Sequence, residues 1–299
     1  MEKETEKKET VIRWVVGIII VICLIGAIFF KKMQEEQPTG VSEGTLEVHY
    51  INVGQADATL VLTSNKSILI DTGRMDVEDA VINYMRSKNV QRLDYLIITH
   101  FDRDHFGEAE DILEKVEIGT IVMPRQEITS IEHQRLMDLV ATKEEIKVLY
   151  ANDIVGKELD GLDELSIKIL APLESFYEES NNYSIVSMVT YGENKFLFTG
   201  DLEDETTICK TYTDAFLSCD AYKVGHHGSK NSSSTEMLLK IKPKIAIISC
   251  GENNDHNHPH KDLLDRLNSI KGLDIYRTDE NGTIVIISNG TECTVKTEK

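Results

Sequence analysis

One short stretch of the sequence combines the residue types and the spacing of a metal-binding site. The segment His100-Phe-Asp102-Arg-Asp104-His105, named here the ligand loop, carries two imidazoles and two carboxylates directly after the apolar run at residues 93–99. Because these groups are costly to leave unpaired at the end of a buried strand, they favour one or two bound divalent cations. The alternative interpretation is a solvated, charged loop in which the histidines are incidental.

Further side chains of the ligand type follow other apolar runs. They are Asp201 after residues 196–199, the pair His226 and His227 after residues 221–224, and His256, His258 and His260 after residues 245–249. Loops at the ends of buried strands gather at one edge of a sheet, so we expect these side chains to meet the ligand loop. His49 and His133 lie outside this pattern and are expected to pack in the core or to face solvent.

Strands and helices that would position these loops alternate along the chain. Short apolar runs bounded by Gly and Asn predict strands, and apolar residues at helical spacing predict helices. We expect strands over residues 46–53, 58–62, 67–70, 93–99, 118–123, 146–150, 166–170, 184–191, 196–199, 221–224, 245–249, 273–277, 282–287 and 292–296, and helices over 76–88, 107–115, 132–142, from about 202, 233–241 and 261–270. This order suits an α/β fold of two stacked sheets with outer helices.

The N-terminal region has a different composition. Residues 11–30 contain a single charge, Arg13, and their length matches a hydrocarbon core of ~30 Å, so a transmembrane anchor is expected. A cleaved signal peptide and a buried core helix are the alternatives. The basic residues on the N-terminal side predict that residues 1–10 are a cytoplasmic tail and that the body lies outside the cell. Residues 31–44 are polar and predict a tether, which leaves residues 45–299 as the catalytic domain.

Composition narrows the classes of function. The chain has 32 Lys and Arg against 51 Asp and Glu, a net charge of −19. Such a surface is unsuited to holding duplex DNA in a broad basic groove, so an anionic substrate needs a local cation, such as a metal ion. The chain has five cysteines, one of them in the apolar run at residues 11–30, which excludes a dense disulfide scaffold. They include no C-x-x-C pair, which excludes a cysteine zinc finger.

Taken together, these segments resemble the metallo-β-lactamase fold, and specifically the hydrolase domain of ComEC-type competence proteins, over about residues 45–290. In chain order the matching segments are His49-Tyr-Ile-Asn-Val-Gly-Gln-Ala-Asp57, Asp71-Thr-Gly73, the ligand loop, Asn182-Tyr-Ser184, Thr199-Gly-Asp201, His226-His-Gly-Ser229 and His258-Pro-His260. The chain departs from the wider superfamily at Asp102, where a histidine is common. It also has no clear match for the further histidine that usually lies between the loop and Asp201.

The resemblance implies an αββα sandwich that holds two divalent metal ions, Zn²⁺ or Mn²⁺. Asp102 in place of histidine shifts the donors toward oxygen, which favours manganese. The implied metal ligands are His100 and Asp102 for one ion, Asp104, His105 and His226 for the other, and Asp201 as a bridge. His226 is preferred because it directly follows a strand, and His227 remains the alternative ligand.

Other residues are expected to contact the ligands or the substrate rather than the metals. They are Asp57, Asp71, Ser184, His227, Lys230 and His260. Asp104, Asp201 and His258 are expected to carry catalysis. His258 would clamp a phosphate or protonate the leaving oxygen, although a simple capping role beside Pro259 is an equal alternative for His258 and His260.

The expected function is a single-pass membrane hydrolase that attacks phosphodiesters, of DNA (single-stranded DNA included) or of nucleotides, with a metal-bound hydroxide. A cell-surface phosphodiesterase that acts on wall polymers such as teichoic-acid phosphocholine is the first alternative, and an inactive, metal-poor binding module is the second. The resemblance also brings in a polytopic channel domain, which we do not expect in this chain, so a separate channel protein is considered as a partner. β-Lactam hydrolysis is not expected without the third histidine ligand.

Overall fold

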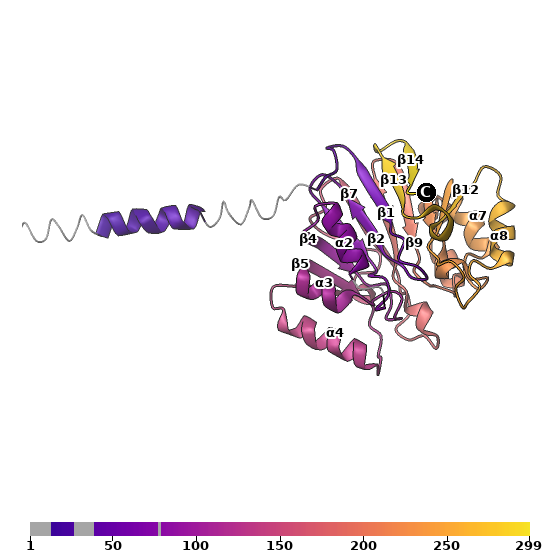
Figure 1. The fold of residues 1–299 in the computed structure, drawn as a ribbon, viewed down its shortest axis with the longest axis horizontal. Helices are drawn as coiled ribbons and strands as arrows, with labels where there is room; N and C mark the ends of the chain where they lie inside the picture. The colour runs from indigo at the N-terminus through magenta and orange to yellow at the C-terminus, as the bar shows by residue number, and fades with distance from the viewer. Residues whose placement is uncertain (1–12, 27–38, 77–78) are drawn as a thin grey trace, which may run out of the picture. The chain divides into compact units, whose positions relative to one another are not determined.

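The first β-sheet joins the beginning and the end of the folded unit (Figure 1). The computed structural model describes residues 13–26, 39–76 and 79–299, and the folded unit covers residues 39–299. Within the described part, eight strands form this sheet in the order β14 (Cys293–Thr297), β13 (Ile284–Ser288), β1 (Leu46–Tyr50), β2 (Thr59–Leu62), β3 (Ser67–Ile70), β4 (Arg92–Ile97), β5 (Glu117–Met123) and β6 (Lys147–Tyr150). β1 pairs antiparallel with both β13 and β2, whereas β3 to β6 run parallel.

The second sheet is built from the later part of the chain. Its six described strands lie in the order β12 (Asp274–Arg277), β11 (Ile245–Ile248), β10 (Ala221–Lys223), β9 (Asn194–Phe198), β8 (Val186–Tyr191) and β7 (Leu165–Ala171). β9 to β12 are parallel, and β7 to β9 are antiparallel. Each sheet therefore contains a group of parallel strands whose carboxyl ends can bring loops together.

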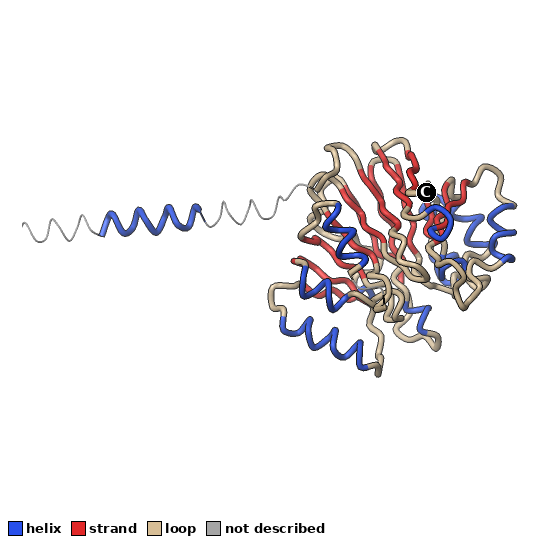
Figure 2. Tube along the Cα trace, viewed as in Figure 1, coloured by secondary structure: helices blue, strands red, loops and turns tan. Residues whose placement is uncertain are grey.

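Helices cover the outer faces of both sheets (Figure 2). The helices of the first half are α2 (Ala80–Ser87), α3 (Ala109–Lys115) and α4 (Ile131–Thr142), and those of the second half are α5 (Thr206–Thr211), α6 (Asp214–Leu217), α7 (Thr235–Ile241), α8 (Lys261–Asn268) and α9 (Thr278–Asn281). Buried side chains form three layers: one between α2 to α4 and the first sheet, one between the sheets, and one between the second sheet and its helices. This arrangement is the predicted αββα sandwich.

Most differences from the predicted elements fall at element ends. In addition, the helix expected from about residue 202 is two helices, α5 and α6, and α9 was not predicted. The first strand ends at Tyr50 rather than at residue 53, and the expected strand at residues 184–191 begins at Val186 after a 3-10 turn, Ser180–Tyr183. Val41 is buried against the outer core layer of the first sheet. Residues 39–44 thus belong to the folded unit rather than to the predicted tether, whose other residues, 31–38, lie outside the described part.

The N-terminal unit is described only over residues 13–26, which are helical. The predicted cytoplasmic tail and both ends of the predicted membrane span, residues 11–12 and 27–30, fall outside the described residues. Among the residues that the structure describes, no helix combines the length and the apolar character needed to cross a bilayer. The predicted transmembrane helix is therefore not confirmed.

Candidate metal centre

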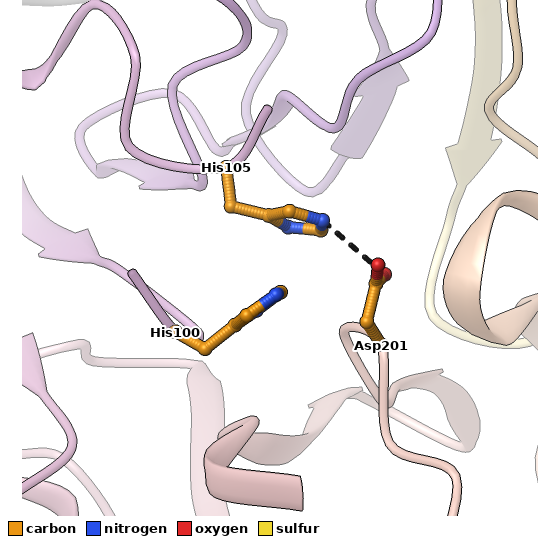
Figure 3. A group of neighbouring side chains, drawn as sticks. All are labelled: His100, His105 and Asp201. Atoms are coloured by element: carbon orange, nitrogen blue, oxygen red, sulfur yellow. Dashed lines mark ion pairs between the residues drawn. The ribbon is translucent and has the colours of Figure 1, made fainter. Parts of the chain in front are cut away.

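The ligand loop leaves the carboxyl end of β4 and points its histidines at a residue from the second sheet. His100 and His105 are buried, and their imidazoles converge with the carboxylate of Asp201, which follows β9 (Figure 3). His105 Nε2 lies 3.2 Å from Asp201 Oδ1. The strand ends of two different sheets thus place these three side chains in one group, as the sequence pattern predicts.

Asp71 fixes the orientation of His105 from the end of β3. Its Oδ2 accepts a hydrogen bond from His105 Nδ1 at 2.8 Å, and its Oδ1 accepts one from the main-chain N–H of Thr99 at 2.8 Å. A histidine ligand commonly donates its second ring N–H to a carboxylate, which holds the ring and its tautomer. Asp71 therefore orients the ring of His105 so that its Nε2 faces the site.

Ser184 connects the two sides of the site. Its Oγ accepts a hydrogen bond from the main-chain N–H of Asp201 at 3.0 Å and lies 3.4 Å from His100 Nδ1. Gly200, with φ of 51°, allows this approach, because a Cβ at that position would come within 2.9 Å of Ser184 Oγ. Ser184 thus contacts the side chain of His100 and the main chain of Asp201, which are both expected ligands.

The structure differs from the expectation at the paired histidines. His227 is buried, and its Nε2 lies 3.3 Å from Asp104 Oδ2 and 3.5 Å from Asp201 Oδ2. His226 is partly exposed; its Nε2 is 3.6 Å from Asp201 Oδ2, and its Nδ1 donates to Glu203 Oε1 at 2.9 Å. The geometry groups His227, and not His226, with Asp104 and His105.

A change in backbone conformation accounts for this difference. β10 ends at Lys223, and the following residues, Gly225–Gly228, form a 3-10 turn in which His226 and His227 have φ values of 48° and 51°. The alternation of side chains along a strand does not extend into left-handed backbone, so the residue nearer the strand need not point to the site. His227 points inward, and its Nδ1 donates to the carbonyl of Ser249 at 3.0 Å.

Asp102 lies at the edge of the site. Its Oδ2 is 3.7 Å from His100 Nε2, and its Oδ1 accepts a hydrogen bond from Ser180 Oγ at 2.8 Å. Ser180 in turn accepts a hydrogen bond from Gln126 Nε2 at 2.9 Å. Neither Ser180 nor Gln126 was singled out by the sequence, because isolated polar residues in loops give no pattern that points to a site.

The remaining predicted residues surround this centre. His258 Nδ1 accepts from Gln55 Nε2 at 3.3 Å, and its ring centroid lies 5.4 Å from that of His226. His260 Nδ1 accepts a hydrogen bond from the main-chain N–H of Lys230 at 3.0 Å. Both residues were expected to contact the ligands or the substrate. Asp57 lies beneath His227, with its Oδ1 3.2 Å from Nδ1 of that histidine.

The two histidines that lay outside the pattern have structural contacts. His133 packs edge-on against Phe101, with ring centroids 4.5 Å apart, and His49 is buried beside the hydroxyl of Tyr84 at 2.9 Å. Three residues were missed by the sequence, since single residues beside a motif carry no recognisable spacing. Glu203 and Ser249 contact the paired histidines, and Lys223 contacts Asp57.

Unpartnered buried atoms show that divalent cations fit this centre. Among the described residues, His100 Nε2, His105 Nε2, His227 Nε2 and Asp201 Oδ1 are buried without a hydrogen-bond partner. Buried polar atoms are rarely left so, and imidazole nitrogens with carboxylate oxygens form a donor set that suits zinc or manganese. Two overlapping groups, His100 with His105 and Asp201, and Asp104 with His105 and His227, each bring their ligand atoms within 4.8 Å of one another.

Electrostatics favours the same conclusion. Burial lowers the pKa of His227, but the carboxylates of Asp201 and Asp57 outweigh this effect and raise that pKa to about 10. The pKa of His105 is raised well above its usual value, because Asp201 and Asp71 outweigh the opposing effect of burial. Carboxylates that favour an imidazolium so strongly also favour a bound metal cation.

Comparison with known proteins identifies the fold family. The family model described as the metallo-β-lactamase superfamily matches residues 51–252, which include the ligand loop, Asp201 and His227. This chain belongs to the metallo-β-lactamase superfamily. The match extends over both sheets and confirms the family that the sequence motifs indicate.

Within the superfamily, the chain is similar to competence proteins. It is 32% identical to ComE operon protein 3 of Bacillus subtilis, over 81% of this chain and 33% of that protein. It is 29% identical to Recombination protein 2 of Haemophilus influenzae, over 87% of this chain and 30% of that protein. The chain thus spans about a third of the length of these relatives, and the resemblance to ComEC-type proteins is confirmed over that part.

Solved structures support the fold. The metallo-β-lactamase fold protein YhfI from Bacillus subtilis aligns with a TM-score of 0.51 at 12% identity, over 80% of this chain and 98% of that protein. A metallo hydrolase from Ignicoccus hospitalis aligns with a TM-score of 0.50 at 16% identity, over 81% and 98% of the two chains. At these identities the likeness concerns the fold alone.

Proposed function

We propose that the unit over residues 39–299 is a metal-dependent hydrolase of phosphodiesters, with DNA, including single-stranded DNA, or nucleotides as its substrates. The proposal rests on the buried His100, His105, His227 and Asp201 atoms that converge without hydrogen-bond partners. Two divalent cations, zinc or manganese, would supply Lewis-acid charge and an activated water at this place. The names of the relatives, which refer to competence and recombination, favour a nucleic-acid substrate.

The proposed division of the ligands starts from the set that the sequence predicts, and His227 joins it because it groups with Asp104 and His105. His100 and Asp102 would hold one cation, and Asp104, His105 and His227 the other. Asp201 would bridge the two sets, because it groups with His100 on one side and its Oδ2 lies 3.5 Å from His227 Nε2 on the other. This assignment replaces His226 of the sequence-based ligand set with His227.

Residues beside the proposed cation positions would bind the phosphodiester. Gln55 donates to His258 Nδ1, so the proton of the neutral ring is on Nε2. Burial and the neighbouring imidazoles lower the pKa of His258 to about 3, so this ring is neutral near pH 7. It is therefore better suited to donating a hydrogen bond to a phosphate oxygen than to protonating the leaving group.

A cavity of about 710 Å³ adjoins the site at Asp104 and is lined by Arg74, Arg103 and His256, together with acidic residues such as Asp76. It offers space for a group attached to the scissile phosphate. Arg74 forms two hydrogen bonds with Asp76, so the groove is not strongly basic. Bound metal ions would therefore supply most of the positive charge that attracts an anionic substrate.

A substrate panel on the full-length protein tests this function. We expect turnover of bis(p-nitrophenyl) phosphate and of single-stranded oligodeoxynucleotides with manganese or zinc, and little turnover of p-nitrophenyl phosphate or nitrocefin. Asp201→Ala serves as the inactive variant, and His133→Ala as a histidine control, because His133 belongs to none of the ligand groups. If the protein turns over only a phosphocholine diester of a wall polymer, that diester and not DNA is its substrate. A folded protein that binds no metal and turns over none of these compounds would refute the proposal.

We also propose that residues 11–30 hold this hydrolase at the cell membrane with residues 45–299 outside the cell. The support is the sequence alone, a run of twenty residues with one charge and a more basic N-terminal flank. Protease added to intact cells should digest the hydrolase unit and spare the N-terminal residues. Full protection of the unit would contradict the orientation, and release of the unit into the medium would contradict the anchor.

A further inference from the structure

Lys223, the last residue of β10, is a charged side chain in an apolar setting. Among the lysines that the structure describes, it alone is buried, with 2% of its surface exposed. A buried ammonium is strongly unfavourable unless it is paired and hydrogen-bonded. The proposed reaction assigns no task to this lysine, so its charge needs an explanation.

The partner of Lys223 comes from the other sheet. Its Nζ donates to Asp57 Oδ2 at 2.7 Å and to the carbonyl of Val224 at 3.1 Å. Asp57 lies in the connection between β1 and β2, so this ion pair links the first sheet to the second. Burial raises the pKa of Asp57, but Lys223 together with the imidazoles of His227 and His105 outweighs this effect, and the pKa lies well below its usual value.

Asp57 in turn contacts two of the residues that would hold one metal ion. Its main-chain N–H donates to the carbonyl of Asp104 at 3.0 Å, and its Oδ1 lies 3.2 Å from His227 Nδ1. Both neighbours of Nδ1, this carboxylate and the Ser249 carbonyl, are acceptors. The proton of the neutral ring is therefore on Nδ1, and Nε2 faces Asp104 and Asp201.

We propose that Lys223 is a positioning residue that holds the Asp57 carboxylate between the two sheets and thereby fixes His227 and Asp104 at one of the two metal positions. This inference rests on the proposed function only in that a metal ion occupies the Asp104, His105 and His227 group. Lys223 itself contacts neither the metal ligands nor the substrate position. It acts through Asp57.

The proposal predicts an effect on one metal ion of the two. Asp57 contacts Asp104 and His227 and lies near His105. His100 and Asp102, the proposed ligands of the other ion, have no hydrogen bond or ion pair with Asp57 among the described residues. Loss of the Lys223 charge leaves the Asp57 carboxylate buried without its cation, so it can leave its place beside His227. Loss of an outer partner of a metal ligand typically lowers metal affinity by ~10–100-fold.

Metal titration of full-length variants tests this. In Lys223→Met, stepwise Mn²⁺ and Co²⁺ titration by calorimetry should show one site weakened by about 10–100-fold and the other within about twofold of wild type. The visible absorption of bound Co²⁺ should change with the weakened site. In the double variant Asp57→Asn/Lys223→Met, the uncharged asparagine side chain keeps an oxygen for His227 Nδ1. We expect the double variant to bind metal at the weakened site about tenfold more tightly than Lys223→Met does.

Lys244→Met is a matched control. Lys244 Nζ also donates to an aspartate, Asp220 Oδ1, at 2.7 Å, but the lysine is exposed and precedes β11 at the opposite ends of the same parallel strands. Its removal should leave both metal affinities within about twofold of wild type. If Lys223→Met fails to fold, the double variant still tests the proposal, because it buries no unpaired charge.

Three results would overturn the proposal. The first is wild-type or tighter binding of both metal ions in Lys223→Met, and the second is equal weakening of both sites. The third is a folded double variant with no recovery, which would show that Lys223 does not act through Asp57. None of these measurements uses a substrate, so a protein that hydrolyses no phosphodiester still tests the role of Lys223.

Discussion

The two sheets supply the metal centre in different ways. The first sheet contributes His100, Asp102, Asp104 and His105 from one continuous loop after β4, and the second contributes Asp201 and His227 from separate loops after β9 and β10. Spacing within one loop can be read from a sequence, whereas the orientation of a single residue after a strand depends on its backbone conformation. The first-sheet side is therefore predictable in detail, and the second only in outline.

The strongest test of this comparison removes the residue at which the two sides meet. Loss of a residue that only orients a metal ligand typically costs up to ~100-fold. Asp201→Ala should lower turnover by more than this, because its carboxylate faces His105, His226 and His227. It should also lose more bound metal than Asp104→Ala, which removes a ligand from one group only. Metal analysis after dialysis, together with turnover of a chromogenic phosphodiester, measures both effects. Equal metal loss in the two variants would argue against a shared carboxylate.

The paired histidines test the second sheet directly. We expect His227→Ala to lower metal occupancy, because its Nε2 faces Asp104 and Asp201. We expect His226→Ala to retain metal and to lose turnover by about 10–100-fold, since its ring contacts Asp201 from the exposed side. Metal titration of the two variants side by side separates them. If His226→Ala empties the site and His227→Ala does not, the assignment from strand alternation was correct after all.

On the first sheet, the corresponding test concerns orientation rather than ligation. Asp71→Asn keeps the shape of the side chain but weakens the hydrogen bond that His105 Nδ1 donates at 2.8 Å. Metal affinity should fall by ~10–100-fold with the fold retained, as judged by circular dichroism. Unchanged affinity would show that the ligand loop holds His105 without help from β3.

The smallest effect on the first sheet concerns Glu108, which follows the ligand loop and contacts the start of α2. Burial raises the pKa of Glu108 to about 7, against the opposing effect of main-chain N–H groups at the start of α2, including that of Val81. A carboxyl with a raised pKa stabilises the fold below its unfolded pKa, and this contribution is lost as the pH rises through about 7. Glu108→Gln keeps the acceptor oxygen and cannot ionise.

The free energy of unfolding of wild type should therefore fall by about 1–2 kcal/mol more than that of Glu108→Gln between pH 4.5 and pH 8. Urea titrations at several pH values give this difference. Parallel pH profiles for the two proteins would show that Glu108 is solvated.

His133→Ala, which alters a contact with Phe101, is expected to change neither metal content nor turnover by more than about twofold.

Most of the fold could be predicted from the sequence, because apolar runs and helical spacing mark the elements that build its core. The ligand loop, Asp71 and Asp201 were also recognisable, since strand ends and motif order locate them. The choice between His226 and His227 was not, because left-handed φ angles after β10 reverse the expected directions. Lys223 was missed for another reason. A lysine in an apolar run looks like an ordinary strand residue until its partner, Asp57, is known.

The place of β1 in the first sheet affects how the protein is made. β1 lies between β2, which follows it directly, and β13, which is synthesised near the end of the folded unit. During translation, the strand that starts the unit therefore keeps one open edge until β13 emerges from the ribosome. An unpaired strand edge is a site of aggregation. Slow synthesis of the last part of this chain should thus favour capture of the nascent unit by chaperones.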